Sequence, residues 1–118
     1  MKQNIIRDKS FAFSLLIIEL YKQLQSDKEF VLSNQLLRSA TSIGANIAES
    51  EAAYSKRDFS LKITIAYKEA FETKYWLELL EISTLTTISV QHHLELINEI
   101  IRILSAITKK VHPRDDIN

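Results

Sequence analysis

The chain has one glycine, Gly44, and one proline, Pro113, in 118 residues, so nearly all of its backbone lacks the residues that form tight turns. A β-sheet protein needs many turns, and glycine and proline make most of them. Leucine, isoleucine, alanine, glutamate and lysine dominate the sequence instead, as they do in helical bundles. The sequence therefore predicts an all-α fold, and its length suits a single domain.

Four segments repeat apolar residues at the alternating three- and four-residue spacing of packed helices, and short polar breaks separate them. Consecutive helices joined by short connections pack antiparallel. The predicted helices are Asp8–Leu24, Leu32–Ala52, a third that Ser55 caps and that ends before Thr84, and Ser89–Val111. We expect one antiparallel up-down-up-down four-helix bundle in residues 1–112, followed by a disordered tail in residues 113–118.

The stretch Leu32–Ser50 carries two neighbouring stripes at helical spacing. One stripe is apolar and forms a packing seam; the other consists of Gln35, Ser39, Ser42, Asn46 and Glu49. A solvent-facing stripe usually contains more Lys and Glu, whereas small polar side chains suit close helix approach with hydrogen bonds across the contact. Gly44 costs about 1 kcal/mol relative to alanine inside a helix, and we expect it to admit a neighbouring helix.

The hairpin between the second and third helices predicts a specific contact. If the chain turns near Ala53 and Tyr54, the numbers of facing residues add up to about 107, which places Arg38 level with Glu69. We predict that Arg38 pairs with Glu69 or Glu72 inside a largely buried polar layer, which sets the register of the helices more than it stabilises them. Residues of the second helix form this layer against the third helix or a neighbouring subunit, and Glu69 and Glu72 complete it from the third helix. The residues of the second helix are Gln35, Arg38, Ser42, Asn46 and Glu49.

The third and fourth predicted helices are apolar on more than one face. Besides its seam, the third contains Leu61, Tyr75 and Ile82, and the fourth contains Leu96 and Ile103. Four helices of one chain bury only one side of each helix, so the excess predicts a homo-oligomer. The alternative is a wide core packed by the helices of one chain only.

Sequence patterns of catalytic and metal sites are missing. The chain has no cysteine and no Glu-x-x-His, the motif of di-metal bundles, and a single glycine excludes a glycine-rich phosphate loop. His92 with Glu95 has the reverse order, and we interpret it as the surface start of a helix. We expect no enzymatic activity, no metal or other cofactor and no small-molecule substrate. Catalysis by the paired carboxylates Glu69 and Glu72 is the alternative to their structural role.

Fifteen basic and fifteen acidic residues balance each other, whereas a dedicated nucleic-acid binder is clearly basic. No apolar segment reaches the ~18 residues of a membrane span, and the first segment lacks a signal-peptide cleavage site. Together with the lack of cysteine, this favours the cytoplasm. Lys56 and Arg57 lie at the predicted tip between the second and third helices, and Lys62 follows. Several copies in a ring could turn this tip into a basic rim, so these three are the candidate nucleic-acid-binding residues.

The stretch LSNQLLRSATSIGANIAES, followed by Ser55, Phe59 and AYKEAFETKYWLELL, resembles a family of four-helix bundle proteins encoded in intervening sequences within bacterial 23S ribosomal RNA genes. The resemblance covers about three quarters of the chain and rests on a long motif. The matching residues are Gln35, Leu36, Arg38, Ser39, Ser42, Ile43, Asn46, Ile47, Ala48 and Glu49, with Glu69, Trp76 and Leu77 downstream.

The resemblance implies an antiparallel bundle that usually assembles as a homopentameric ring, without an established enzymatic activity. It also implies similarity to the accessory protein of diversity-generating retroelements, a pentameric barrel with a basic surface that binds nucleic acid and the reverse transcriptase. This chain differs from that relative in its net charge of zero. We expect a non-enzymatic oligomeric scaffold whose partners are further copies of itself and RNA or an RNA–protein complex. The alternative is a purely protein-binding adaptor ring without nucleic-acid affinity.

Overall fold

The computed structural model describes residues 2–111, with side chains from Ile5 onward, and this part of the chain consists of four α-helices without a β-strand. The helices are α1 (Lys2–Ser26), α2 (Val31–Ser50), α3 (Lys56–Ser83) and α4 (Gln91–Val111). The all-α prediction is confirmed. Only α1 differs much from its predicted bounds: it begins earlier because Ile6, which is completely buried, continues the inward row of Phe13 and Ile17. The predicted tail, residues 113–118, lies outside the described residues.

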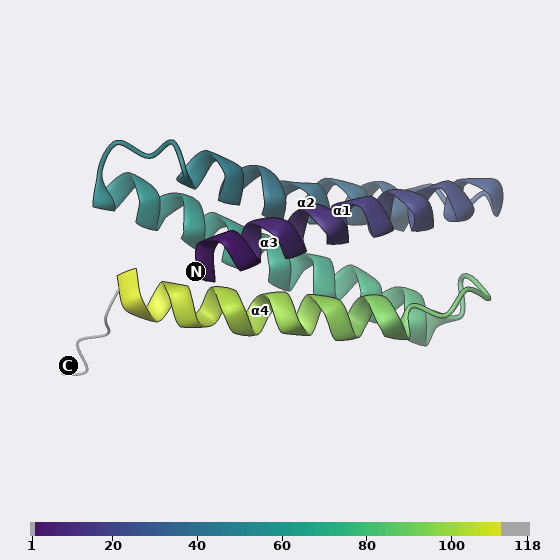
Figure 1. The fold of residues 1–118 in the computed structure, drawn as a ribbon. Helices are drawn as coiled ribbons and strands as arrows, with labels where there is room; N and C mark the ends of the chain where they lie inside the picture. Colours follow the sequence, from purple (N-terminus) through teal and green to yellow (C-terminus); the bar gives the residue numbers. More distant parts are fainter. Residues whose placement is uncertain (1, 112–118) are drawn as a thin grey trace.

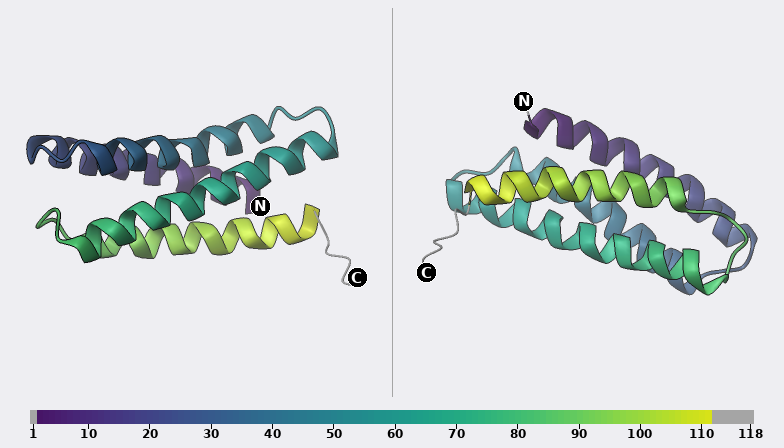
Figure 2. Two further views of the ribbon diagram at one scale, coloured as in Figure 1. Left: turned by 180° about the vertical axis from the view of Figure 1, so that it is seen from behind. Right: turned by 90° about the horizontal axis from the view of Figure 1, so that it is seen from below.

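The helices enclose one core. Each packs against its neighbours in the chain, and α1 also contacts α4. Figure 1 shows the α1–α2 and α3–α4 connections at one end of the molecule and the α2–α3 connection at the other, where α4 also finishes. Figure 2 shows from two further sides that the helices lie lengthwise beside one another. The α2–α3 connection, the first turn of α3 and the last turn of α4 are therefore close neighbours in space.

The apolar seam predicted in α2 comprises five residues, of which Leu32 is half-buried against the core. The other four are at most 1% exposed to solvent: Leu36, Ala40, Ile43 and Ile47. The seam packs against an equally buried row on α3, to which α4 adds a further set of aliphatic side chains. Burying a leucine or isoleucine side chain contributes roughly 1.5–3 kcal/mol, so these rows dominate the stability of the fold. The buried row on α3 comprises Ile63, Ala66, Ala70, Leu77 and Leu80.

Ser55 fixes the start of α3, as the sequence predicts. Its backbone is extended, with φ −157° and ψ 162°, and its side-chain oxygen accepts a hydrogen bond of 3.0 Å from the backbone N–H of Asp58. This cap satisfies one of the backbone donors that the first turn of a helix leaves free. It also fixes the direction in which Lys56 and Arg57 leave the end of the molecule.

Gly44 faces α1, but less tightly than expected. A Cβ atom at this position would lie 3.6 Å from the side-chain oxygens of Ser10 and Ser14 and 3.7 Å from the carbonyl oxygen of Ser10. These are ordinary van der Waals distances, so the neighbouring helix leaves room for a methyl group. A neighbouring helix does lie against Gly44, as expected, but these distances show that its approach does not depend on glycine.

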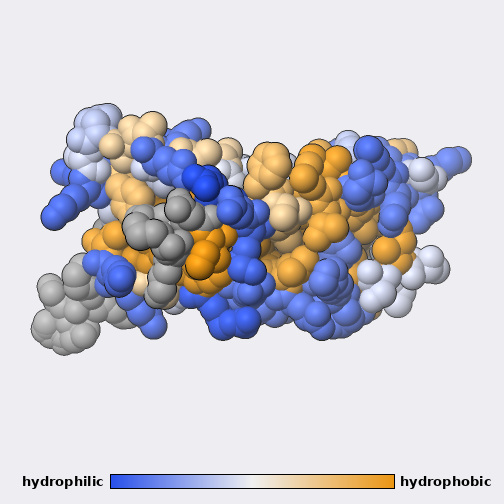
Figure 3. Space-filling model, viewed as in Figure 1, coloured by the Kyte–Doolittle hydropathy of each residue, from blue (hydrophilic) through white to orange (hydrophobic). Residues whose placement is uncertain are grey.

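Large apolar side chains remain on the surface of the single chain. Phe11 and Leu15 on α1 are 66% and 52% exposed, and α3 carries a further exposed set. Figure 3 shows apolar groups among the polar ones along the face formed by α1 and α4. The exposed set on α3 comprises Leu61, Phe71, Tyr75 and Ile82.

Candidate functional site

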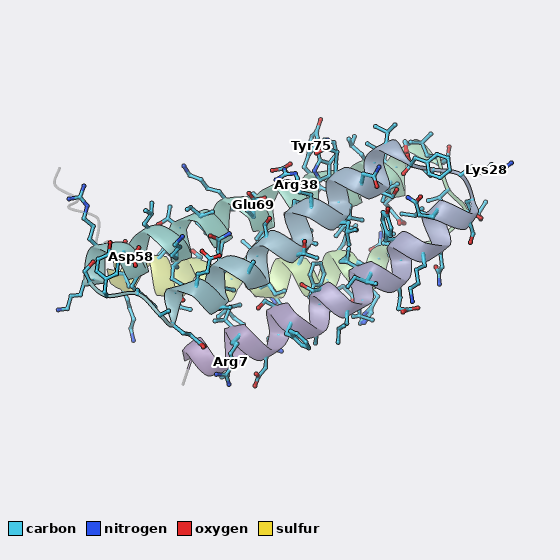
Figure 4. All side chains as sticks on the ribbon, turned by 90° about the horizontal axis from the view of Figure 1, so that it is seen from above. Arg7, Lys28, Arg38, Asp58, Glu69 and Tyr75 are labelled. Carbon is cyan, nitrogen blue, oxygen red and sulfur yellow. The ribbon has the colours of Figure 1, made fainter. Side chains whose placement is uncertain are left out.

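Arg38 joins α2 to α3 through two carboxylates. Its Nη2 donates a 2.7 Å hydrogen bond to Oε2 of Glu72, and its Nη1 lies 4.0 Å from Oε2 of Glu69. The indole Nε1 of Trp76 donates to the same Glu72 oxygen at 3.2 Å. Figure 4 shows Arg38 and Glu69 beside Tyr75, midway along the two helices. The predicted pairing of Arg38 is confirmed, with Glu72 as the closer partner.

The expected burial of this polar layer is wrong. The Arg38 side chain is 55% exposed, and Gln35 is also exposed, because this stripe lies beside the buried seam and not within it. An exposed ion pair contributes only about 0.2–1 kcal/mol. In the single chain, the Arg38 contact therefore aligns α2 and α3 without adding much stability.

Glu69 is the most unusual member of this cluster. Its Oε1 atom is buried without a hydrogen-bond partner among the described residues, and its side chain is only 21% exposed. Burial raises the pKa of Glu69, the neighbouring Glu72 carboxylate raises the pKa further, and Arg38 acts in the opposite direction. In the folded chain, Glu69 thus takes up a proton at a higher pH than an ordinary exposed glutamate does.

The remaining residues of the predicted layer do not join the Arg38 cluster. The side-chain amide of Asn46 donates at 2.8 Å to the backbone carbonyl of Ser42, so this contact stays within α2. Glu49, which is 58% exposed, accepts a 2.8 Å hydrogen bond from Nζ of Lys62 on α3. The predicted single layer is therefore a row of separate contacts, because its members lie on a helix face that is open to solvent.

A buried polar contact joins Ser39, a member of the predicted polar stripe, to Thr73 on α3, a partner that the sequence does not indicate. Their side-chain oxygens share a 2.9 Å hydrogen bond, and neither residue has exposed surface. Ser39 also contacts the backbone carbonyl of Leu36 at 3.3 Å, and Thr73 that of Glu69 at 2.9 Å. Helical spacing places each of the two hydroxyls on a packed stripe of its own helix. Their pairing depends on the register of α2 against α3, which the spacing does not give.

The α2–α3 end carries three cations that form what we call the basic tip: Lys56, Arg57 and Lys110. None of the three has an ion pair with another described residue. Lys62, the third predicted nucleic-acid contact, differs from them because its ammonium is paired with Glu49. Its hydrogen bond to Glu49 and the charge of that carboxylate raise the pKa of Lys62. The structure thus separates Lys62 from Lys56 and Arg57, and it adds Lys110 from the end of α4.

Open hollows surround the basic tip. One, of about 710 Å³, lies between the α2–α3 connection and the end of α4, and Tyr54, Lys56 and Lys110 line it. A second, of about 420 Å³, lies beside it and is lined by Lys56 and Arg57 among others. The described residues that line these two hollows include no carboxylate. Figure 4 places Asp58 and Arg7 at this end of the molecule, opposite Lys28.

No arrangement of three or more metal-ligating side chains occurs among the described residues. His92 and Glu95 are 68% and 76% exposed, and Nδ1 of His92 lies 3.8 Å from the Glu95 carboxylate. Their place in the first turns of α4 agrees with the surface interpretation. Within the part of the chain that the structure covers, no helix is long and apolar enough to cross a membrane.

Comparison with known proteins identifies the family. The sequence profile of the family described as 23S rRNA-intervening sequence protein matches residues 2–108. The chain belongs to this family. A similar crystal structure, described as a protein with unknown function from the S23 ribosomal protein family of Bacteroides thetaiotaomicron, is 49% identical in sequence. It superposes with a TM-score of 0.87, over 92% of this chain and 99% of that one. No curated protein matches the chain.

Membership of the 23S rRNA-intervening sequence protein family agrees with the resemblance seen in the α2 motif. The matched region includes all of α2 and α3, and hence Arg38, Glu69 and Glu72. The relative of known structure has no assigned function in its description.

Proposed function

We propose that this protein is a non-enzymatic scaffold: an antiparallel four-helix bundle that assembles with copies of itself, in a pentameric ring, and binds RNA at its basic tip. The observation that carries the proposal is the set of uncompensated cations at one end of a chain whose net charge is zero. Phosphate groups attract cations that lack a carboxylate partner, and neutralising them releases counterions. The family description, which refers to 23S rRNA, favours RNA as the nucleic acid.

Self-assembly strengthens the RNA proposal. A ring repeats the basic tip once for each subunit, so several weak sites can contact one RNA molecule at the same time. The exposed apolar side chains on α1 and α3 supply surfaces for subunit contacts. Arg38 and its partners lie away from the tip, and their part in this proposal is architectural.

A filter-binding titration at low salt tests the RNA part. The double variant Lys56→Gln/Arg57→Gln is expected to bind RNA more weakly, and the slope of log affinity against log salt is expected to fall by about 0.7 for each single-strand phosphate contact removed. Lys62→Gln is the matched control, since Glu49 already neutralises that ammonium, and it should change affinity less. A wild-type protein without affinity for RNA or DNA at low salt contradicts this part of the proposal.

The second candidate is a protein-binding adaptor, which the exposed apolar face of α3 favours. Phe71, Tyr75 and Ile82 lie on one side of α3 at helical spacing and are 47%, 55% and 79% exposed, and a contiguous exposed apolar patch is typical of an interaction surface. A pull-down with the intact protein after nuclease treatment separates the two candidates, because only a protein partner survives the treatment.

Catalysis by Glu69 and Glu72 has less support. The hollows at the basic tip lie away from both residues, and the Glu72 carboxylate already accepts hydrogen bonds from Arg38 and Trp76.

A further inference from the structure

Tyr54 stands out at the basic tip because its ring is almost entirely free. It lies in the α2–α3 connection and is 91% exposed, the most exposed large apolar or aromatic side chain of the described residues. It has no hydrogen bond or ring contact with another described residue. By contrast, Tyr75 packs edge-on against Trp76, and Tyr67 against Phe71. The capped start of α3 places this free ring two residues before Lys56.

The hollow next to Tyr54 has a fixed apolar wall and a basic rim. Phe59 and Val111 line it and also pack against the core, so the fold itself holds them in place. Lys56 and Lys110 also line this hollow, and Arg57 lines the adjoining hollow, which shares Lys56 and Val111. The volume of about 710 Å³ falls within the range of roughly 300–1,000 Å³ that small-molecule sites occupy.

We propose that this hollow receives an unpaired nucleobase that stacks on Tyr54, while Lys56, Arg57 and Lys110 contact the phosphates on either side. The inference rests on the proposed function and specifies its ligand as a single-stranded stretch of nucleic acid. Proteins that bind single strands combine aromatic stacking platforms with a cationic surface that follows the backbone. The base faces inside a duplex are already covered by neighbouring bases, so a free ring gains little from a duplex.

The charge distribution favours nucleic acid over an apolar peptide. An apolar groove for a peptide needs no uncompensated cations, yet the two hollows carry three cations and no carboxylate among their described lining residues. Asp58 follows on the same turn of α3, and Glu51 in the connection is engaged by Arg7 at 3.4 Å. A strand of alternating bases and phosphates matches both features of the site, the ring and the cations.

The test uses the intact protein and fluorescence anisotropy at low salt, with a labelled oligouridine and a blunt-ended duplex of the same charge as probes. Tyr54→Ala is expected to weaken oligouridine binding about 5- to 150-fold, since stacking on one aromatic ring is worth about 1–3 kcal/mol per base. Tyr54→Phe keeps the ring and should retain wild-type affinity. Duplex affinity should not change in either variant. Phe30→Ala removes a half-exposed ring from the opposite end of the molecule and is the matched control.

The outcomes separate this inference from the proposed function. If Tyr54→Ala binds oligouridine as the wild type does, while Lys56→Gln/Arg57→Gln binds weakly, nucleic-acid binding stands and stacking on Tyr54 is overturned. If the wild type binds neither probe, both proposals are overturned. Poly-glutamate is an anionic chain without bases. If it competes with the labelled probe as effectively as unlabelled oligouridine does, the requirement for a base is overturned. Full competition by uridine monophosphate at the same nucleotide concentration overturns the requirement for a strand.

Discussion

The hydroxyls of Ser39 and Thr73 share a 2.9 Å hydrogen bond in the buried contact between α2 and α3. Arg38, the residue next to Ser39, reaches Glu72, the residue next to Thr73, at 2.7 Å on the exposed side of the same contact. One buried and one exposed polar contact thus define the same register. The buried contact determines the register more strongly than the exposed one. If α2 slipped by one turn along α3, the two buried hydroxyls would lose their hydrogen bond to each other.

Thr73→Val replaces the hydroxyl by a methyl group of similar shape and leaves Ser39 without its cross-helix partner. We expect the free energy of unfolding to fall by about 1–2 kcal/mol, because Ser39 keeps only its contact with the Leu36 carbonyl. Urea unfolding measures the loss. Adding Ser39→Ala should restore part of it, and strictly additive effects would contradict the proposed coupling. Thr41→Val, at a half-buried hydroxyl that contacts only its own helix, is the control and should cost less than about 0.5 kcal/mol.

Gly44→Ala is expected to stabilise the protein by about 0.5–1 kcal/mol, because alanine costs less conformational entropy in a helix than glycine does. The added methyl would meet Ser10 and Ser14 at 3.6 Å without a clash. Gly44→Leu should have the opposite effect, since a larger side chain would press α1 away from α2. Thermal unfolding of the two variants beside the wild type checks both signs. A lower melting temperature for Gly44→Ala would show that the α1–α2 contact is tighter than the distances indicate.

The pKa of Glu69 predicts a pH dependence of stability. Burial and Glu72 raise this pKa above the ordinary value of 4.5, so the folded chain binds more protons than the unfolded chain between the two values. The contribution of Glu69 to the free energy of unfolding therefore decreases as the pH rises from 4.5 through the pKa of the folded chain. Glu69→Gln should be more stable than the wild type at pH 7, and the difference should shrink as the pH is lowered.

Chemical unfolding of the Glu69→Gln variant at pH 7 and in acid measures this difference. Comparing each variant with the wild type at the same pH cancels the contribution of His93, whose pKa burial lowers and which acts with the opposite sign. Glu78→Gln changes an exposed carboxylate on the same helix and is the control. An equal stability difference at both pH values would show that Glu69 gains its effect from packing and not from its proton.

Much of this architecture follows from apolar spacing alone. The seams of α2 and α3 and the Ser55 cap are local properties, because helical periodicity and capping depend on residues a few positions apart. The partner of Arg38 depends on how the chain turns at residues 51–55. Facing residue numbers add up to 110 for Arg38 with Glu72 and 112 for Ser39 with Thr73, against the expected 107. The connection thus shifts the register by about one turn, which no local rule predicts.

The candidate site was less predictable than the fold. Lys62 is close to Lys56 and Arg57 in the sequence and was therefore grouped with them, but in the structure it forms an ion pair with Glu49 on α2. Lys110 is far from Lys56 in the sequence and joins the tip only because α4 ends beside the start of α3. Charge runs describe a single segment, whereas a binding surface combines segments that the topology brings together.

The last prediction concerns self-assembly through the exposed apolar side chains of α3. Phe71 and Ile82 are 47% and 79% exposed on α3, away from the hollows at the basic tip, and assembly would bury them. Phe71→Glu is expected to reduce the solution mass measured by light scattering from a multiple of 13.6 kDa to 13.6 kDa, because a charge in an apolar contact carries a large desolvation cost. The variant should stay helical by circular dichroism, since the side chain already reaches solvent. Val31→Glu, at a residue that is 73% exposed at the start of α2, is the control and should leave the mass unchanged. A wild-type mass of 13.6 kDa would contradict the oligomer, and the RNA proposal would then rest on the tip of one chain.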